Sequence, residues 1–293
     1  MSINRRTLLK SLATAGATVA AAPVTALARA PKRRPDDAVG LLYDATKCIG
    51  CKACMTACRE NAGLDPAARE GLWDDPLSLD ANAKNIIKLA KGENGAESFM
   101  KMQCMHCADP GCVSVCMLGA LQKGDKGIVT YDVDRCIGCR YCQVACPFNV
   151  PAFEWKSNTP QIVKCDLCVN RQQEGKIPAC ADVCPREAVI FGNVNDLLKD
   201  AHARIESEPE KYENKIYGET DGGGTQVFYL TSKQVSFASL GLPQLGEKSV
   251  PSMPEKIQHT IYKGFFAPVA LYAVLGAVIF RNRKRGQEEE VES

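Results

Sequence analysis

The sequence predicts an α+β fold in which short strands, cysteine-rich loops and short helices alternate. All sixteen cysteines of the 293-residue chain lie between Cys48 and Cys184, in four groups of four. Short β-prone runs flank these groups, such as Ile128–Tyr131 before the third and Ala188–Phe191 after the fourth. An apolar run near the end of the chain predicts, in addition, one C-terminal transmembrane helix.

The spacing within each group is the strongest signal in the sequence. Two groups read Cys-x2-Cys-x2-Cys-x3-Cys, one has x4 in the middle and the last has x11. In chain order they are Cys48, Cys51, Cys54 and Cys58; Cys104, Cys107, Cys112 and Cys116; Cys136, Cys139, Cys142 and Cys146; and Cys165, Cys168, Cys180 and Cys184. Pro147 and Pro185 follow the last two groups, whereas Arg59 and Met117 follow the first two. This repeat uses every cysteine of the chain.

Such spacing is typical of the ligands of 4Fe–4S clusters. Three thiolates can come from one tight loop, in which Gly50 and Gly138 let backbone N–H groups turn toward the sulfides. The fourth cysteine starts a helix that points away, and in two-cluster ferredoxins it binds the neighbouring cluster. Four motifs therefore predict four 4Fe–4S clusters in tandem ferredoxin-like domains, as two pseudo-symmetric cluster pairs.

Two other uses of cysteine fit this sequence less well. Zinc sites usually combine Cys-x2-Cys knuckles or mix cysteine with histidine, and the chain has only three histidines. A zinc-binding structural module is nevertheless the alternative from another class. A disulfide framework would need neighbouring cysteines to find distant partners. His106 lies inside the second motif, where we expect a packing residue or a hydrogen-bond donor rather than a ligand.

Residues 1–28 predict a twin-arginine signal peptide. Arg5 and Arg6 precede a weakly apolar stretch, and Ala26-Leu27-Ala28 is an Ala-x-Ala cleavage pattern. A basic amphipathic helix or an ordinary secretory signal are the alternatives. Because twin-arginine transport moves folded proteins, cysteines exported while bound to iron would escape disulfide formation in the periplasm.

An uncharged run near the other end predicts a membrane anchor. Residues 264–280 would rise about 26 Å as a helix, against about 30 Å for a hydrocarbon core, and residues 261–263 can extend the span. The basic cluster Arg281–Arg285 follows, and the positive-inside rule keeps such a cluster cytoplasmic. We therefore expect a periplasmic protein anchored to the inner (cytoplasmic) membrane. A buried core helix is the alternative.

These signals divide the chain into six segments. They are a signal peptide (1–28), a linker (29–40), a four-cluster ferredoxin-like domain (41–200), a C-terminal extension (201–260), a transmembrane helix (261–280) and a cytoplasmic tail (281–293). Further elements expected are a helix near Asn82–Lys91, a flexible turn at Gly222–Gly224 and a strand near Gln226–Leu230.

The charge balance and the motif inventory limit the function. The chain has 36 Lys and Arg against 34 Asp and Glu; removing the three basic residues of the signal peptide leaves 33 against 34. A near-neutral chain without a basic stripe gives no support to a nucleic-acid partner. The sequence shows no Ser/His/Asp arrangement, Walker loop or Gly-x-Gly-x-x-Gly. It predicts an electron-transfer subunit of an oxidoreductase complex, with no catalytic site of its own.

The four motifs, in this order, resemble those of the four-cluster ferredoxin-like iron–sulfur subunits of bacterial membrane oxidoreductases. Members that serve nickel–iron hydrogenases are the more similar, at Leu42–Asp44, Lys101–Cys107, Gly222–Val227 and Ile257–Gly264. The resemblance implies electron transfer from the small and large subunits of a periplasmic nickel–iron hydrogenase, which oxidises H2, to a multi-helix membrane subunit that reduces quinone. The equivalent β subunit of a molybdenum or tungsten oxidoreductase, such as formate dehydrogenase, is the alternative.

The same resemblance implies how the motifs share their cysteines, joining the first motif with the fourth and the second with the third. The implied ligand sets are Cys48, Cys51, Cys54 and Cys184 (cluster 1); Cys58, Cys165, Cys168 and Cys180 (cluster 2); Cys104, Cys107, Cys112 and Cys146 (cluster 3); and Cys116, Cys136, Cys139 and Cys142 (cluster 4). Met117 departs from the family, since many relatives have proline there. His259, just outside the expected anchor, is expected to be an ordinary interfacial residue.

Overall fold

The computed structural model describes residues 33–64, 78–155, 157–252, 254, 268 and 271–282. The chain divides into two units, and residues 31–252 form the one that contains all sixteen cysteines. In the other unit, residues 271–282 are helical. The expected signal peptide, most of residues 261–270 and His259 lie outside the described residues. Within the part that is described, no helix is both long and apolar enough to cross a membrane.

The described elements of the larger unit are short, and strands alternate with helices along the chain. The strands are β1 (Val39–Asp44), β2 (Asn85–Lys91), β3 (Glu97–Gln103), β4 (Leu121–Lys123), β5 (Val129–Tyr131), β6 (Ala152–Phe153), β7 (Ile162–Val163), β8 (Val189–Asn193) and β9 (Val227–Leu230). The α-helices are α2 (Ala53–Ala62), α3 (Gly111–Ser114), α4 (Tyr141–Val144), α5 (Val169–Gln173), α6 (Ala179–Asp182) and α7 (Val194–Ser207). Three 3-10 turns are η1 (Asp125–Gly127), η2 (Val133–Arg135) and η3 (Asp221–Gly223). The mixed α and β content agrees with the predicted class.

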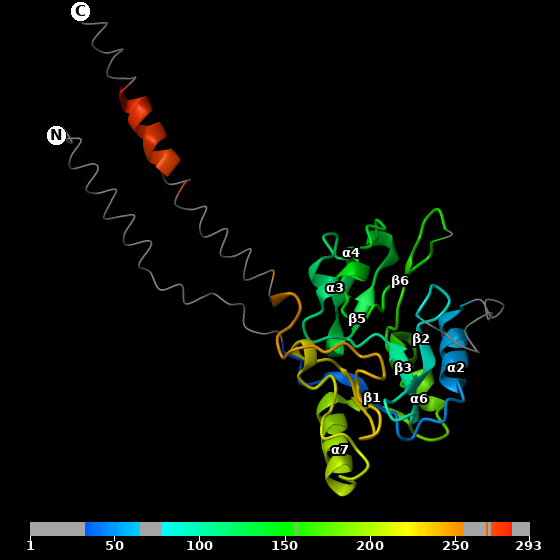
Figure 1. Ribbon diagram of the computed structural model, residues 1–293. Helices are drawn as coiled ribbons and strands as arrows, with labels where there is room; N and C mark the ends of the chain where they lie inside the picture. Colours follow the sequence, from blue (N-terminus) through cyan, green and yellow to red (C-terminus); the bar gives the residue numbers. More distant parts are fainter. Residues whose placement is uncertain are drawn as a thin grey trace, which may run out of the picture. The chain divides into compact units, whose positions relative to one another are not determined.

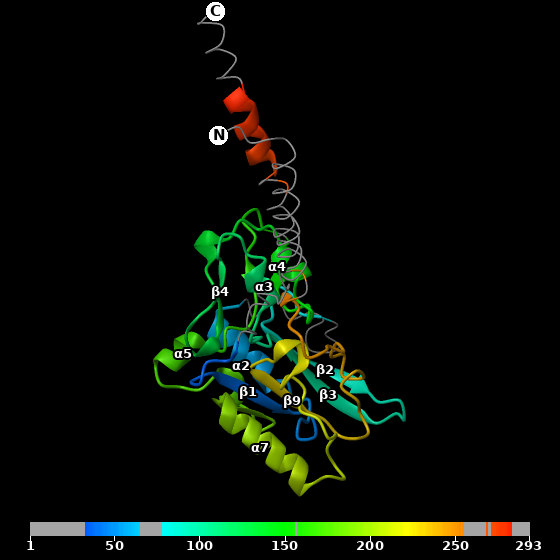
Figure 2. The ribbon, with the colours of Figure 1, turned by 90° about the vertical axis from the view of Figure 1, so that its left-hand side faces the viewer.

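A three-stranded sheet joins segments that are far apart in the sequence. Its central strand β1 pairs with β8 in antiparallel and with β9 in parallel orientation. Leu41 of β1, for example, lies opposite Phe191 on one side and Val227 on the other. The strand before the first cysteine motif, the strand after the fourth and a strand of the C-terminal extension therefore form one sheet (Figures 1 and 2).

The two faces of this sheet pack against different parts of the unit. Leu42 and Phe228 face helix α7, which buries a stripe formed by Val194, Leu197, Ala201 and Ile205. The neighbouring residues Leu41 and Tyr43 point to the opposite face, where they join the apolar core around the cysteine motifs. Figure 2 shows α7 running beneath β1 and β9. The sheet thus separates α7 from the cysteine-rich part of the unit.

The expectation of a helix near Asn82–Lys91 was wrong, because residues 85–91 form strand β2. This strand pairs with β3 over its whole length, from Asn85 opposite Gln103 to Lys91 opposite Glu97. The tight turn between them ends at Gly95, whose φ of 78° is easy only for glycine. The β-branched Ile86 and Ile87 are both buried in the core. Pairing with a partner strand, and not the local pattern of residues 82–91, decides the structure here.

The strands expected beside the motifs and near Gln226 are confirmed with small shifts. The run Ile128–Tyr131 forms β5, Ala188–Phe191 leads into β8, and Gln226–Leu230 contains β9. The glycines at 222–224 form a turn in which all three residues have positive φ. This turn is fixed by neighbours, because the N–H of Ala108 donates to the carbonyl of Gly224 (2.9 Å). It therefore holds part of the C-terminal extension against the loop of the second cysteine motif.

A buried carboxylate fixes the end of β1 close to the first motif. The carboxylate of Asp44 is fully buried, and it accepts hydrogen bonds from the Tyr212 hydroxyl (2.8 Å), the Arg204 guanidinium (3.1 Å) and the Thr46 hydroxyl (2.6 Å). Arg204 also pairs with the more exposed Asp200 (2.7 Å). A buried charge that loses one partner retains its desolvation cost, so Asp44 stabilises the link between β1 and α7 far more than Asp200 does.

We expect Asp44→Ala to lower the midpoint of anaerobic thermal unfolding by about 5–10 °C, because it leaves buried donors without an acceptor. The matched control Asp200→Ala removes a partly exposed partner of the same arginine and should cost less than about 3 °C. Equal shifts for the two variants would contradict the role given to Asp44.

Candidate metal centres

The third cysteine of every motif lies on a short helix, and the fourth lies either on that helix (Cys58) or two residues beyond its end (Cys116, Cys146 and Cys184). The third cysteine is the second residue of α2, α3, α4 or α6, and the fourth follows four positions later. Within α2, Cys54 and Cys58 share a helix face but stand about 6 Å apart along the axis. Helix α2 packs against α6, and α3 packs against α4. Each packed pair of helices can therefore bring the fourth cysteine of one motif close to the loop of the other.

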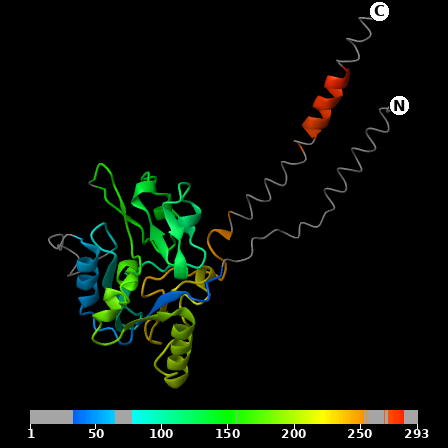
Figure 3. The same cartoon turned by 180° about the vertical axis from the view of Figure 1, so that it is seen from behind.

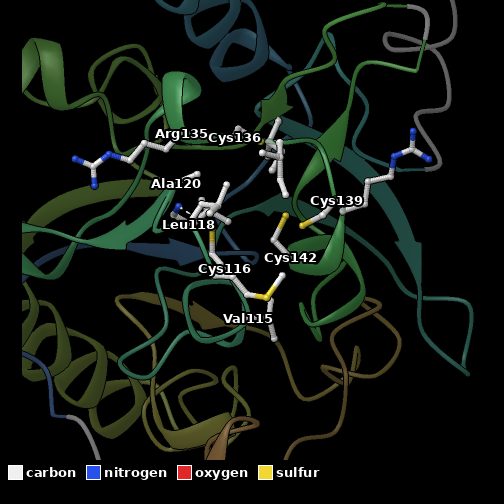
Figure 4. A pocket seen from close by; sticks show the side chains of 13 residues that line it. Val115, Cys116, Leu118, Ala120, Arg135, Cys136, Cys139 and Cys142 are labelled. Carbon is white, nitrogen blue, oxygen red and sulfur yellow. Dashed lines mark hydrogen bonds between the residues drawn. The ribbon is translucent and has the colours of Figure 1, made fainter.

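One cavity shows this sharing directly (Figure 4). Its lining includes Cys136, Cys139 and Cys142 of the third motif, together with Cys116 of the second. In the close-up view the sulfur atoms of Cys116, Cys139 and Cys142 point into a common space. The cavity encloses about 410 Å³, including space open to solvent. These four residues form one candidate centre, which we call quartet 4.

Two further cavities are lined in the same way by the first and fourth motifs. One is lined by Cys48, Cys51, Cys54 and Cys184, which we call quartet 1, and encloses about 370 Å³. The other is lined by Cys58, Cys165, Cys168 and Cys180, which we call quartet 2, and encloses about 320 Å³. The first and fourth motifs thus exchange Cys58 and Cys184.

The remaining cysteines, Cys104, Cys107, Cys112 and Cys146, form quartet 3. They are recognised as a group because members of the set raise the thiol pKa values of other members. Burial, above all, raises the pKa of the Cys107 thiol well above its ordinary value, and the next causes are Cys104, Cys146 and Cys112. Burial likewise raises the pKa of Cys112 to about 12, followed by the effects of Cys104 and Cys146. The second motif therefore collects Cys146 from the third, in exchange for Cys116.

The loops share an unusual backbone conformation at one position. The residue before the second cysteine has positive φ in all four motifs, at Gly50 (69°), His106 (46°), Gly138 (69°) and Leu167 (53°). This turn aims backbone N–H groups at sulfur: Gly50 donates to Cys48 (3.5 Å) and Leu167 to Cys165 (3.4 Å). Two motifs adopt the conformation without glycine, at a cost of about 1–2 kcal/mol each, so surrounding contacts must hold it in place.

Burial keeps several of these thiols in the protonated form as long as no metal binds them. It raises the pKa of Cys54 and of Cys58 to about 12, and nearby sulfurs add to the effect while Lys101 opposes it. A metal bound to a thiol removes its proton outright. These sites thus suit a group that supplies its own positive charge.

The residues present fit iron–sulfur cubes. In quartets 1, 2 and 4 the cysteines surround a space, as ligands at the corners of a cube must, whereas zinc would draw four sulfurs to about 2.3 Å from one point. Among the described residues, no group of three or more His, Cys, Asp or Glu is arranged to hold a single metal ion.

His106 is buried and belongs to none of the quartets. Its Nδ1 accepts a hydrogen bond from the N–H of Val129 (3.0 Å), which leaves Nε2 as the protonated nitrogen of a neutral ring. Burial first, and then Lys164 and Lys123, hold the pKa of His106 well below its usual value. The imidazole therefore stays neutral and helps to fix the loop that carries Cys107.

Several buried polar residues near the quartets were not predicted from the sequence. Lys101 and Lys164 are buried amines close to cysteines. Gln226 connects three segments: its amide donates to the carbonyls of Val39 (2.6 Å) and Lys126 (2.9 Å), and its backbone N–H donates to Met105 (3.0 Å). These contacts join residues far apart in the chain, so spacing alone could not reveal them.

Two family profiles match the cysteine-rich part of the chain. One, described as a 4Fe-4S dicluster domain, covers residues 96–194, and one described as a 4Fe-4S binding domain covers residues 41–62. Together they contain every cysteine motif of the chain. The protein is therefore a ferredoxin-type iron–sulfur protein.

Curated relatives place it more closely. Hydrogenase-2 operon protein HybA of Escherichia coli O157:H7 is 38% identical over 98% of each chain. The nitrate-inducible formate dehydrogenase iron-sulfur subunit of Escherichia coli K12 is 34% identical over 87% of each chain. The formate dehydrogenase iron-sulfur subunit of Haemophilus influenzae is 34% identical over 82% of this chain and 78% of that one. The chain belongs to the same family as these proteins. It is an iron–sulfur electron-transfer subunit of the hydrogenase-2 or formate dehydrogenase type.

The crowding at Gly50 makes the first loop testable. A Cβ on Gly50 would lie 2.4 Å from the Phe99 ring, whereas a Cβ on Gly63, also at positive φ, would meet nothing within 4 Å. Gly50→Ala should therefore lower the iron content by about four atoms per chain, while Gly63→Ala keeps it. Iron and sulfide analysis after anaerobic purification measures this. Identical iron contents in the two variants would show that the close packing at Gly50 is not needed.

Proposed function

We propose that each quartet binds one 4Fe–4S cluster and that the chain conducts electrons through four such clusters in two pairs. When bound, the clusters supply single-electron chemistry. The proposal is carried by one observation: each quartet combines three cysteines of one motif with one of another. The loops hold the ligands, the apolar core keeps water from the buried sulfurs, and the helices fix how far apart neighbouring quartets lie.

We further propose that the electron donor is a nickel–iron hydrogenase, with its small and large subunits, and that the acceptor is a multi-helix membrane subunit that reduces quinone. The match to HybA over nearly the whole of both chains supports this choice. The similarity to formate dehydrogenase subunits, which is lower and covers less of the chain, supports a formate-oxidising partner as the second candidate.

The proposed location is the periplasmic side of the inner membrane. It is supported by the two arginines of residues 1–28, by the uncharged run 264–280 and by the basic cluster that follows it. The anchor would consist of residues 261–280, with residues 281–293 as a cytoplasmic tail. Export after folding would protect the thiolates.

The exchange of fourth cysteines can be tested within the fourth motif. Cys180 lies on helix α6 and Cys184 just beyond its end, but they belong to quartets 2 and 1. In anaerobic redox titrations followed by electron paramagnetic resonance, Cys184→Ser should alter the same cluster signal as Cys48→Ser. Cys180→Ser should alter the signal that Cys58→Ser alters. If Cys180→Ser and Cys184→Ser altered one common signal, the proposed ligand sets would be wrong.

The partner can be tested by anaerobic purification of the tagged chain from membranes. We expect nickel and H2-dependent dye reduction in the purified complex, because the proposed donor is a nickel–iron hydrogenase. Molybdenum or tungsten with formate-dependent dye reduction would instead support the second candidate. Recovery of the mature chain only from the cytoplasmic soluble fraction would contradict the proposed location.

A further inference from the structure

A buried lysine lies between two of the quartets. Lys101 is in strand β3, its side chain is completely buried, and its amine donates to the side-chain oxygen of Gln103. Among the described residues, no carboxylate forms an ion pair with it. A buried ammonium ion without a counter-charge costs several kcal/mol, so its surroundings must supply negative charge.

The face of the hairpin that carries this amine lies against quartets 1 and 2. Lys101 is opposite Ile87, which lines the cavity of quartet 1, and Gln103 is opposite Asn85, which lines the cavity of quartet 2. Burial opposes the charged form of the amine, but Cys180, Cys54, Cys165 and Cys58 outweigh burial and hold the pKa of Lys101 above its ordinary value. The effect is mutual, since Lys101 lowers the pKa of Cys54, Cys58 and Cys165. Cys54 belongs to quartet 1, and the other three belong to quartet 2. The amine therefore faces both centres at once.

Hydrogen-bond donors exceed acceptors at this place. A lysine ammonium can donate three hydrogen bonds, and the described residues provide one acceptor for it, Gln103 Oε1. Because Lys101 can only donate, Gln103 must turn its oxygen toward it, and Gln103 Nε2 is buried without an acceptor among the described residues. Buried donors are nearly always satisfied in folded proteins. The unsatisfied donors of Lys101 and Gln103 therefore suit an electron-rich bound group that can accept their hydrogen bonds.

One other lysine near quartet 2 is neutralised by a carboxylate. Lys84 also lies near Cys58 and Cys165, but it pairs with the carboxylate of Asp166 at 2.8 Å. Lys101 has no such partner, so its charge acts on the quartets without local compensation. Strand β3 pairs with β2, which packs against α2, the helix that carries Cys54 and Cys58 (Figure 3).

We propose that Lys101 is a positioned charge that raises the reduction potentials of the clusters held by quartets 1 and 2 together. This proposal rests on the cluster assignment proposed above. Reduction adds one negative charge to a cluster that four thiolates already make anionic, so a fixed positive charge nearby stabilises the reduced form. Acting on both members of a pair, it makes both clusters easier to reduce.

The test replaces the charge while conserving shape. In the full chain, purified anaerobically with its complex, Lys101→Met should lower the potentials of two clusters. The ratio of reduced to oxidised cluster at a fixed ambient potential should fall about tenfold, which corresponds to about 59 mV for one electron. The other two clusters should titrate as before. The matched control is Lys91→Met, on the exposed part of the same hairpin. It should leave all four reduction potentials unchanged.

If Lys101→Met loses iron, a second variant tests the effect of the lysine charge on the two potentials. Gln103→Glu keeps the lysine and places a carboxylate beside it, so it should lower the same two potentials. The inference is overturned if a variant with full iron content leaves the two potentials unchanged, or lowers all four equally. It is also overturned if neither variant retains iron, because Lys101 would then be needed for assembly and not for tuning. Failure of the proposed function would be seen separately, as fewer than four clusters in the unaltered chain.

Discussion

The structure depends on how its cysteines are divided between neighbouring quartets. The third and fourth cysteines of each motif are four positions apart in the sequence, and they belong to different quartets. Packing of α2 against α6 and of α3 against α4 brings a second loop to each fourth cysteine. A group bound by a quartet would therefore cross-link two segments: quartets 1 and 2 would join Cys48–Cys58 to Cys165–Cys184. The sheet supports this closure, because β1 and β8, which flank the two segments, are paired strands.

The same arrangement creates an electrostatic problem that the surrounding residues help to solve. Collecting sixteen cysteines in a single unit brings thiolates close together once a metal binds them, and burial raises the cost of each charge. Lys101 and Lys164 place buried amines beside these sulfurs, and backbone N–H groups in the left-handed loops point at others. The cysteine loops and the buried amines therefore act together, because both place positive charge or N–H groups beside the sulfur atoms. This explains why a near-neutral protein contains fully buried lysines.

Much of this could be predicted from the sequence because ligand spacing is a local property. The strands at Ile128–Tyr131 and Ala188–Phe191 follow from short β-prone runs beside the motifs, and the family follows from the motifs themselves. Residues 82–91 were misjudged because their structure is decided by pairing with β3. The burial of Lys101 could not be predicted, since only the packing of β3 and β2 beside the first and fourth motifs shows what it faces. Cluster binding by each quartet stays a prediction.

The most direct measurement is anomalous diffraction at the iron absorption edge from crystals of the anaerobically purified protein. The account predicts four separate iron sites, one between the sulfurs of each quartet, with Cys184 at the site of Cys48 and Cys146 at the site of Cys104. Iron sites in which all four cysteines of one motif surround a single cluster, or crystals that contain zinc in place of iron, would contradict it.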